Sequence, residues 1–384
     1  MRESTRGDVL FVLPVLGQPR DAKRIAMLQA AGFVVKGVAF DRQYHRGRMP
    51  ECEVEILATI EHRKYLKRLV ILASVVPALR RAIRRADVVY ASGPDMGLAA
   101  VIAGWGTGTP AIFEVGDVQR AQVSGGLLGN AVRLLDRFGA RSAKLIVTTA
   151  QGFVDEYYRR WLGVETPALL LENKLESSVM DAAGCDVPSR PAGSPGVDRP
   201  LRVGYFGLLR CEWSWRVLEA LAKAYPTAVE VVVAGRPIDP TNLPERAAGL
   251  PNVDFRGEYR SPDDLPGLYG DVDLVWGSYP YPKPDELNWR WARTNRFYES
   301  CRFGRPIIGL EGSADLVEIL RLDIGMSVGG DDVRAAADRV AAVSVEDLDR
   351  WAANLRELPR AVYEYTSEGE DLARKIDTIL DVDH

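Results

Sequence analysis

The sequence predicts an α/β protein built from two doubly wound parallel sheets. Apolar runs with the length of buried strands alternate with amphipathic segments along most of the 384 residues, which is typical of parallel strands covered by helices. A Pro-, Gly- and Ser-rich stretch at 185–200 interrupts this alternation and reads as surface linker. A chain of this length is also too long to fold around one compact core. We therefore expect an N-terminal domain over 1–175, a linker over 176–200, a second domain over 201–360, and a C-terminal helix over 361–384 that could pack back on the first domain.

The first half opens on a strand and continues as strand–helix repeats. Gly32 ends the first expected helix, and an apolar run follows at once. The expected strands are 9–13, 33–40, 87–91, 110–115 and 144–149. The expected helices are 21–31, 64–85, 95–104, 127–142 and 151–162.

The second half repeats this organisation after the linker. Its expected strands are 201–206, 229–234, 253–256, 272–277 and 306–310. Its expected helices are 213–225, 261–269, 294–303, 313–320 and 331–342, followed by a helical tract over 345–381 that Pro359 could break. Two such halves predict a cleft between them, with ligands at the carboxyl ends of the strands.

Composition excludes several classes of function. A net charge of −4 provides no basic excess for a general nucleic-acid binder. The four cysteines show no disulfide or metal-ligand spacing, as in proteins of a reducing cytosol. The first apolar run, at 9–16, is short and contains Pro14, so we expect a strand and not a signal peptide. No run reaches the roughly 20 apolar residues that span a bilayer.

The most informative stretch is TNRFYESCRFGRPIIGL at 294–310. It predicts a short helix that begins near Thr294 and ends at Gly304. The helix carries Asn295, Arg296 and Glu299. A helix N-terminus and a guanidinium attract phosphate, and a carboxylate one turn later can accept hydrogen bonds from a ribose diol. The arrangement therefore predicts a site for a nucleotide diphosphate.

A second motif, GYFGLLR at 204–210, runs from an expected strand into a loop before a helix. Gly207 would let the main chain approach a phosphate closely, and Arg210 could meet the diphosphate from the side opposite Arg296. A simple strand–helix turn at Gly207 is the alternative explanation. The phosphate-binding interpretation is favoured because the motif lies in the same half as the helix at 294–303.

These motifs, together with VVVAGRP at 231–237 and the segment 252–279, resemble GT-B glycosyltransferases. The chain is similar to glycosyltransferase family 4 and to bacterial exopolysaccharide and lipid-linked sugar transferases near it. The resemblance covers most of 201–310 and is looser over 8–40, 87–117 and 144–173. It implies two Rossmann-like domains that face each other across a cleft.

The resemblance also implies roles for individual residues. Arg210 and Arg296 would contact the diphosphate of a sugar donor and offset the charge on the leaving group. Glu299 would bind the ribose. The segment containing Tyr259 would meet the base. The remaining residues placed with the donor are Gly207, Gly235 and Asn295.

One position departs from the family pattern. Many family 4 enzymes have a pair of glutamates spaced Glu-x7-Glu, of which the second corresponds to Glu299. The position of the first is Trp291. Trp289 and Trp291 could stack on a sugar or anchor the core, and we expect at least one of them to pack.

In the N-terminal half, FEVGD at 113–117 ends an expected strand at its carboxyl edge. Glu114 is unusual within a buried strand, and the resemblance implies an acidic residue facing the acceptor here. Asp117 could act as general base on an acceptor hydroxyl or cap the following helix or turn. Gly17 and Gln18, after the first strand, are further candidates for the cleft, with a turn as the simpler explanation for Gly17.

No metal site is expected. Asp271 and Asp273 form a D-x-D motif, but they open a strand at the end away from the cleft, where turn and cap roles are common. The three histidines have no metal-ligand spacing. We expect no bound cofactor, a nucleotide diphosphate sugar as co-substrate and no metal requirement.

Residues 62–85 hold eight lysines and arginines around an apolar centre. Such a segment could contact anionic lipid headgroups from the cytoplasmic side, or it could be an ordinary helix whose charges are solvated. The first alternative would suit a lipid-linked acceptor.

The sequence thus predicts a glycosyltransferase that moves a sugar, with UDP favoured as the nucleotide, to a saccharide or lipid-linked acceptor. The alternatives are a nucleotide-sugar epimerase of the same fold and a non-catalytic nucleotide-sugar-binding or scaffold protein. Product analysis with donor alone and with acceptor would separate them.

Overall fold

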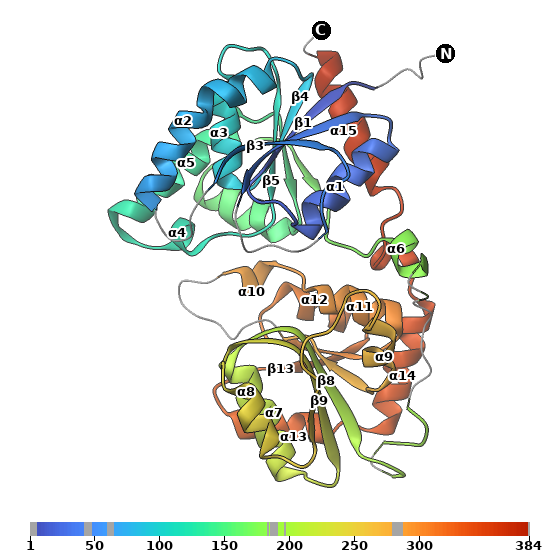
Figure 1. The fold of residues 1–384 in the computed structure, drawn as a ribbon. Coiled ribbons are helices and arrows are strands. Elements are labelled where there is room, and N and C mark those ends of the chain that lie inside the picture. The colour runs from blue at the N-terminus through green and yellow to red at the C-terminus, as the bar shows by residue number, and fades with distance from the viewer. Residues whose placement is uncertain are drawn as a thin grey trace. The chain divides into compact units, whose positions relative to one another are not determined.

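A computed structural model describes residues 6–41, 48–59, 65–182, 184, 191–195, 197–278 and 287–382. The chain divides into two compact units. Unit 1 comprises Met1–Asn173 and Ser367–His384, and unit 2 comprises Lys174–Thr366. Each unit is a separate α/β body with its own parallel sheet (Figure 1).

Unit 1 contains a seven-stranded sheet in the order β3-β2-β1-β4-β5-β6-β7, with every neighbouring pair parallel. The order reverses between β1 and β4, which makes the sheet doubly wound. Its strands are β1 (Asp8–Leu13), β2 (Val34–Asp41), β3 (Glu53–Thr59), β4 (Val88–Ser92), β5 (Ala111–Val115), β6 (Leu145–Thr148) and β7 (Ala168–Leu170).

Alternate residues of β1 fill two different cores. Phe11 faces a core that α1 and α15 complete, whereas Val12 faces a core that α2 and α3 complete. The C-terminal helix α15 packs beside α1 (Figure 1). The helices of unit 1 are α1 (Pro19–Ala30), α2 (Tyr65–Ile83), α3 (Pro94–Gly104), α4 (Arg120–Val123), α5 (Gly126–Ser142), the π-helix η1 (Phe153–Trp161) and α15 (Glu368–Val382).

Unit 2 contains a six-stranded parallel sheet in the order β10-β9-β8-β11-β12-β13. Helices α7 and α13 cover one face, and α9 and α11 cover the other. The strands are β8 (Leu201–Arg210), β9 (Val229–Asp239), β10 (Val253–Phe255), β11 (Leu274–Trp276), β12 (Ile307–Leu310) and β13 (Gly325–Val328). The helices are α6 (Ser177–Ala182), α7 (Glu212–Ala224), α8 (Leu243–Ala248), α9 (Leu265–Gly270), α10 (Asn288–Trp291), α11 (Asn295–Phe303), α12 (Ala314–Arg321), α13 (Val333–Ala341), α14 (Val345–Glu357) and the 3-10 turn η2 (Arg360–Val362).

The predicted fold class is confirmed, whereas several details differ. Strands β3, β7 and β13 were not expected from the sequence. Residues 207–210, expected as a loop, continue β8 and pair with β9. Within the stretch expected as linker, Met180 of α6 is buried in the core of unit 2. No helix in the described part of the chain has both the length and the hydropathy needed to cross a bilayer.

Candidate functional site

Helix α11 begins and ends where the sequence predicts. Thr294 is its N-cap residue, and Gly304 adopts the left-handed conformation at its C-terminus with φ 62°. The backbone N–H of Thr294 donates to Asp315 Oδ2 at 3.0 Å. This bond from α12 fixes the first turn of α11 relative to the sheet. Asn295 is exposed at the first helical position.

Arg296 points from this first turn to the main chain within β8 and just after β11. Its Nη1 donates to the carbonyl of Phe206 at 2.8 Å, and its Nη2 donates to the carbonyl of Ser278 at 3.4 Å. A side-chain carbon at Gly207 would lie 3.8 Å from Arg296 Nη1 and 3.8 Å from the hydroxyl of Tyr259. The guanidinium is therefore held beside a glycine, where a ligand can approach the main chain.

Glu299 lies one turn further along α11 and is buried. It accepts a hydrogen bond from the Tyr269 hydroxyl at 2.6 Å. Burial, followed by the charge of Glu299, raises the pKa of Tyr259, and Arg296 opposes this rise. The charges of Arg296 and Glu299 thus have opposite effects on the pKa of Tyr259.

Arg210 is exposed at the end of β8. Burial raises the pKa of Tyr205, and the charges of Arg296 and Arg210 counter that effect. The Arg296 guanidinium lies 5.9 Å from the centre of the Tyr205 ring. The structure thus brings Arg210 and Arg296 to the same end of β8.

Gly235 lies opposite Gly207 in the β8–β9 ladder. Its φ is +137°, and a side-chain carbon there would lie 1.9 Å from the carbonyl oxygen of Gly207. Its backbone N–H donates to the carbonyl of Gly257 at 2.7 Å. Glycine is therefore required at 235 for main-chain packing, and contact with a donor remains a prediction.

In unit 1, Glu114 is fully buried within β5. Its carboxylate pairs with Arg24 Nε at 3.3 Å and Arg20 Nε at 3.4 Å, and it accepts a short hydrogen bond from the Tyr90 hydroxyl. Two guanidiniums and a phenol provide the compensation that a buried charge needs. Glu114 therefore joins β4 and β5 to α1, and its contact with an acceptor stays a prediction.

The other expected residues of unit 1 lie around this edge of the sheet. Gly17 has φ +79° in the turn between β1 and α1, as the simpler explanation requires. Gln18 is the N-cap residue of α1. Asp117 is exposed after β5, but the N-cap of α4 is Gln119, which forms a capping box with Gln122. Asp117 is therefore not the N-cap residue of α4, and its role in the turn before that helix stays a prediction.

The sequence analysis missed Asp21. This carboxylate is 2% exposed in the first turn of α1 and accepts a hydrogen bond from Ser92 Oγ at 2.7 Å, while its Oδ2 is buried without a hydrogen-bond partner. Burial raises its pKa to about 6, and the charge of Glu114 adds to the rise. An acidic residue two positions after Pro19, at the start of a helix, is a signal visible in the sequence. Its burial is not visible there, because it depends on Ser92, 71 residues away in the chain.

Asp21 should make stability depend on pH. The folded state binds its proton more tightly than the unfolded chain, so the free energy of unfolding falls as pH rises from about 4 to about 6. A shift of this size corresponds to roughly 1–3 kcal/mol. In Asp21→Asn this part of the pH dependence should disappear, making the variant more stable than wild type at pH 8 in urea titrations.

Asp117→Asn, which changes an exposed carboxylate at the same edge, is the control and should retain the wild-type slope. Asp315, whose pKa burial also raises to about 6, should keep part of the slope in both variants. An unchanged slope in Asp21→Asn would contradict the assignment.

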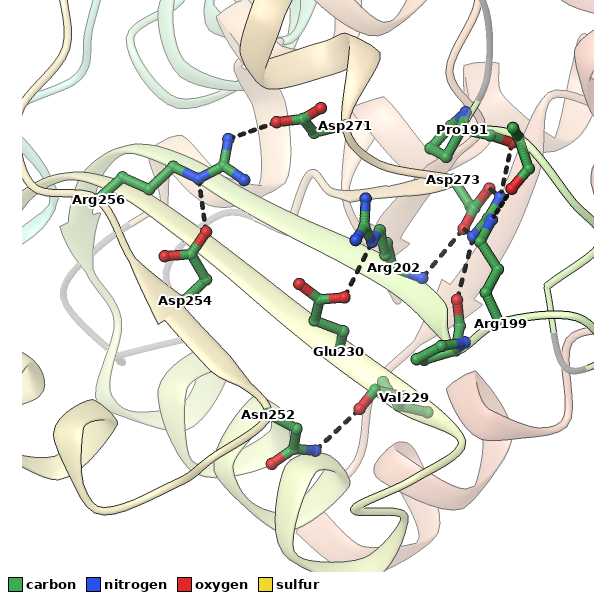
Figure 2. A network of polar contacts seen from close by, with 12 residues as sticks. Pro191, Arg199, Arg202, Val229, Glu230, Asn252, Asp254, Arg256, Asp271 and Asp273 are labelled. Carbon is green, nitrogen blue, oxygen red and sulfur yellow. Dashed lines mark hydrogen bonds and ion pairs between the residues drawn. The ribbon is translucent and has the colours of Figure 1, made fainter.

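The D-x-D pair is structural. Asp273 is buried at the start of β11 and accepts hydrogen bonds from both terminal nitrogens of Arg199, at 2.6 and 2.7 Å (Figure 2). Asp271 pairs with Arg256, which also holds Asp254. The described residues include no cluster of His, Cys, Asp and Glu suited to a metal ion. His45, His62 and His384 lie outside the described residues.

Both tryptophans of α10 pack. Trp291 is 8% exposed, and Trp289 is partly buried against the core that α7 and α13 share. Packing of at least one of them was expected, and neither side chain is fully exposed.

Comparison with known proteins finds relatives among the glycosyltransferases. A family model described as a glycosyl transferase 4-like domain matches residues 22–174. Succinoglycan biosynthesis protein ExoL of Rhizobium meliloti (strain 1021) is 28% identical over 341 residues, which cover 86% of this chain and 83% of ExoL. The chain is thus similar to glycosyl transferase 4-like domains over residues 22–174 and to ExoL over most of its length.

Solved structures agree with this fold. HepE of Anabaena, in complex with UDP, superposes with a TM-score of 0.65 at 15% identity and covers 97% of this chain and 100% of its own. WaaG, a glycosyltransferase involved in lipopolysaccharide biosynthesis, gives a TM-score of 0.67 at 16% identity, covering 96% and 99%. At these identities the likeness concerns the fold of the transferase.

Proposed function

We propose that this transferase moves a sugar from a UDP-sugar to a saccharide or lipid-linked acceptor during polysaccharide assembly, at the cytoplasmic side of a membrane. The position of Arg296 carries the proposal: a guanidinium at a helix start, beside a glycine and one turn from a buried carboxylate. The UDP bound to HepE and the role of ExoL in succinoglycan biosynthesis support the choice of donor and pathway.

In the donor site, Arg296 and Arg210 bind the diphosphate and stabilise the charge that develops as the glycosidic bond to it breaks. The exposed start of α11 at Asn295 adds backbone donors. Glu299, oriented by Tyr269, accepts hydrogen bonds from the ribose. The remaining residues assigned to the donor are Gly207, Gly235 and Tyr259.

On the acceptor side, Asp117 is the candidate general base. Its exposure at the carboxyl end of β5 leaves its carboxylate accessible to a hydroxyl group. Gly17 and Gln18 lie at the end of β1 and are assigned to acceptor contact. The reaction is assigned no metal ion, since two arginines supply the charge that a cation provides in other transferases.

The experiment is a thermal-shift panel followed by product analysis. UDP at 100 times its Kd should raise the free energy of unfolding by about 3 kcal/mol, and GDP should raise it less. UDP-sugar should then release UDP faster when a saccharide acceptor is present. Conversion of the donor without acceptor would indicate an epimerase, and no shift with any nucleotide would contradict the donor site.

The proposal includes membrane contact through residues 62–85, most of which form α2. Residues 62–64 lie outside the described residues, whereas Arg81, Arg84 and Arg85 are exposed at the C-terminal end of this segment.

A further inference from the structure

Helix α5 has its apolar side outward. Its inner face buries Gly129, Asp136, Gly139 and Ala140. Its outer face exposes Leu127, Leu128, Leu134 and Leu135, by 90%, 76%, 67% and 47%. Helices of globular proteins normally bury such an apolar stripe, so this face is not explained by the core of unit 1.

The inward polar face is secured by its own contacts. Asp136 accepts hydrogen bonds from Gln122 Nε2 at 2.6 Å and from the Tyr158 hydroxyl at 3.1 Å. A side-chain carbon at Gly139 would lie 3.6 Å from the main chain of Leu98 in α3. Because Asp136 is buried in these bonds and Gly139 is buried against α3, the leucines on the other side of α5 face outward.

Trp105 extends the apolar surface. Its ring is 69% exposed and stacks on Phe138 of α5, with centroids 6.3 Å apart. Arg80 Nη1 donates to the Trp105 carbonyl at 2.7 Å, which places the basic end of α2 next to the indole. A hollow of about 410 Å³, lined in part by Ser142 and Lys144, opens beside Trp105.

The segment that carries this surface is basic. Residues 120–144 contain five arginines and lysines and a single acid, the buried Asp136, in a chain whose net charge is −4. Arg133, Arg137 and Arg141 follow at intervals of four and form a row along α5 beside the leucines. Leucines and a tryptophan with basic flanks are typical of helices that lie in a membrane interface.

We propose that the α5–Trp105 face, formed by Leu127, Leu128, Leu134, Leu135, Phe138 and Trp105, docks this chain on an anionic lipid bilayer. The apolar side chains enter the interface, and the arginines beside them contact the headgroups. Charge complementarity favours lipid over a second copy of the chain, because a symmetric dimer would bring the same arginines face to face. The proposal does not depend on which sugar or nucleotide the enzyme uses.

The test is co-sedimentation of the full chain with vesicles of phosphatidylcholine, with and without phosphatidylglycerol. Wild type should bind the anionic vesicles and be released by salt. Leu128→Ser with Leu134→Ser should weaken binding at least about tenfold, since each leucine transfers to lipid favourably. Both positions are exposed, so the melting temperature should stay unchanged.

The matched control is Val317→Ser with Leu320→Ser, which removes two exposed apolar side chains from α12 of unit 2, 68% and 54% exposed. It should bind vesicles like wild type. Arg137→Gln with Arg141→Gln should reduce both the binding and its salt dependence. Transfer to a water-soluble acceptor should be unaffected in all three variants, which separates this proposal from the proposed function.

Three results would overturn the assignment: no binding of wild type to anionic vesicles, equal binding of the leucine variant, or equal loss in the α12 control. A wild-type dimer that the leucine variant converts to a monomer, without vesicle binding by wild type, would assign the face to self-association instead.

Discussion

Arg296→Ala should lower kcat/KM for the UDP-sugar donor by about 100- to 1000-fold, the usual effect of removing one preorganised donor from a developing negative charge. Its guanidinium contacts two main-chain carbonyls, that of Phe206 within β8 and that of Ser278 just after β11. The variant therefore loses the cation and also the bonds that hold the Gly207 segment against α11. UDP release in the presence of acceptor measures the effect.

Two substitutions keep this test specific. Arg321→Ala removes an exposed arginine of α12 that pairs with Glu318, and should leave turnover unchanged. Arg296→Lys keeps the charge but not the forked geometry and should fall between wild type and alanine. Near-wild-type turnover in Arg296→Ala with an unchanged UDP thermal shift would remove Arg296 from the donor site.

The helix that carries Arg296 was predictable because its signals are local. Gly304 and Pro306 terminate it within three residues of each other, and the left-handed φ of Gly304 is the conformation that this C-terminal signal implies. The placement of Arg296 and Glu299 on one face follows from helical spacing. These inferences require no knowledge of the rest of the fold.

The polar cluster of unit 1 was not predictable in the same way. Glu114 lies 90 residues from Arg24 in the chain, yet they form a buried pair. A single sequence shows an acid within an apolar strand, and a ligand-facing residue is a reasonable inference from it. Only the fold shows that arginines from α1 neutralise the charge and that Asp21 is buried beside them.

Strand β8 shows a third limit on what the sequence alone can predict. A glycine after an apolar run predicts a turn, yet Gly207 stays in the ladder because Gly235 faces it from β9. Glycine at 235 allows the strands to continue, because a side chain there would collide with the main chain of Gly207. The pattern is visible only once the two strands are known to be neighbours in this register.

That register makes Gly235→Ala the substitution with the largest expected loss of stability, at least about 3 kcal/mol. The new side-chain carbon would start 1.9 Å from the Gly207 carbonyl oxygen, at a φ of +137° that alanine rarely adopts. Urea titration should show the loss, and the stabilisation by bound UDP should weaken because Phe206 and Gly207 must shift.

Gly257→Ala is the matched control: its φ is +74°, but its side-chain position is open, so strain alone should cost about 1–2 kcal/mol. Equal losses in the two variants would mean that backbone conformation, and not the Gly207–Gly235 contact, sets the requirement for glycine.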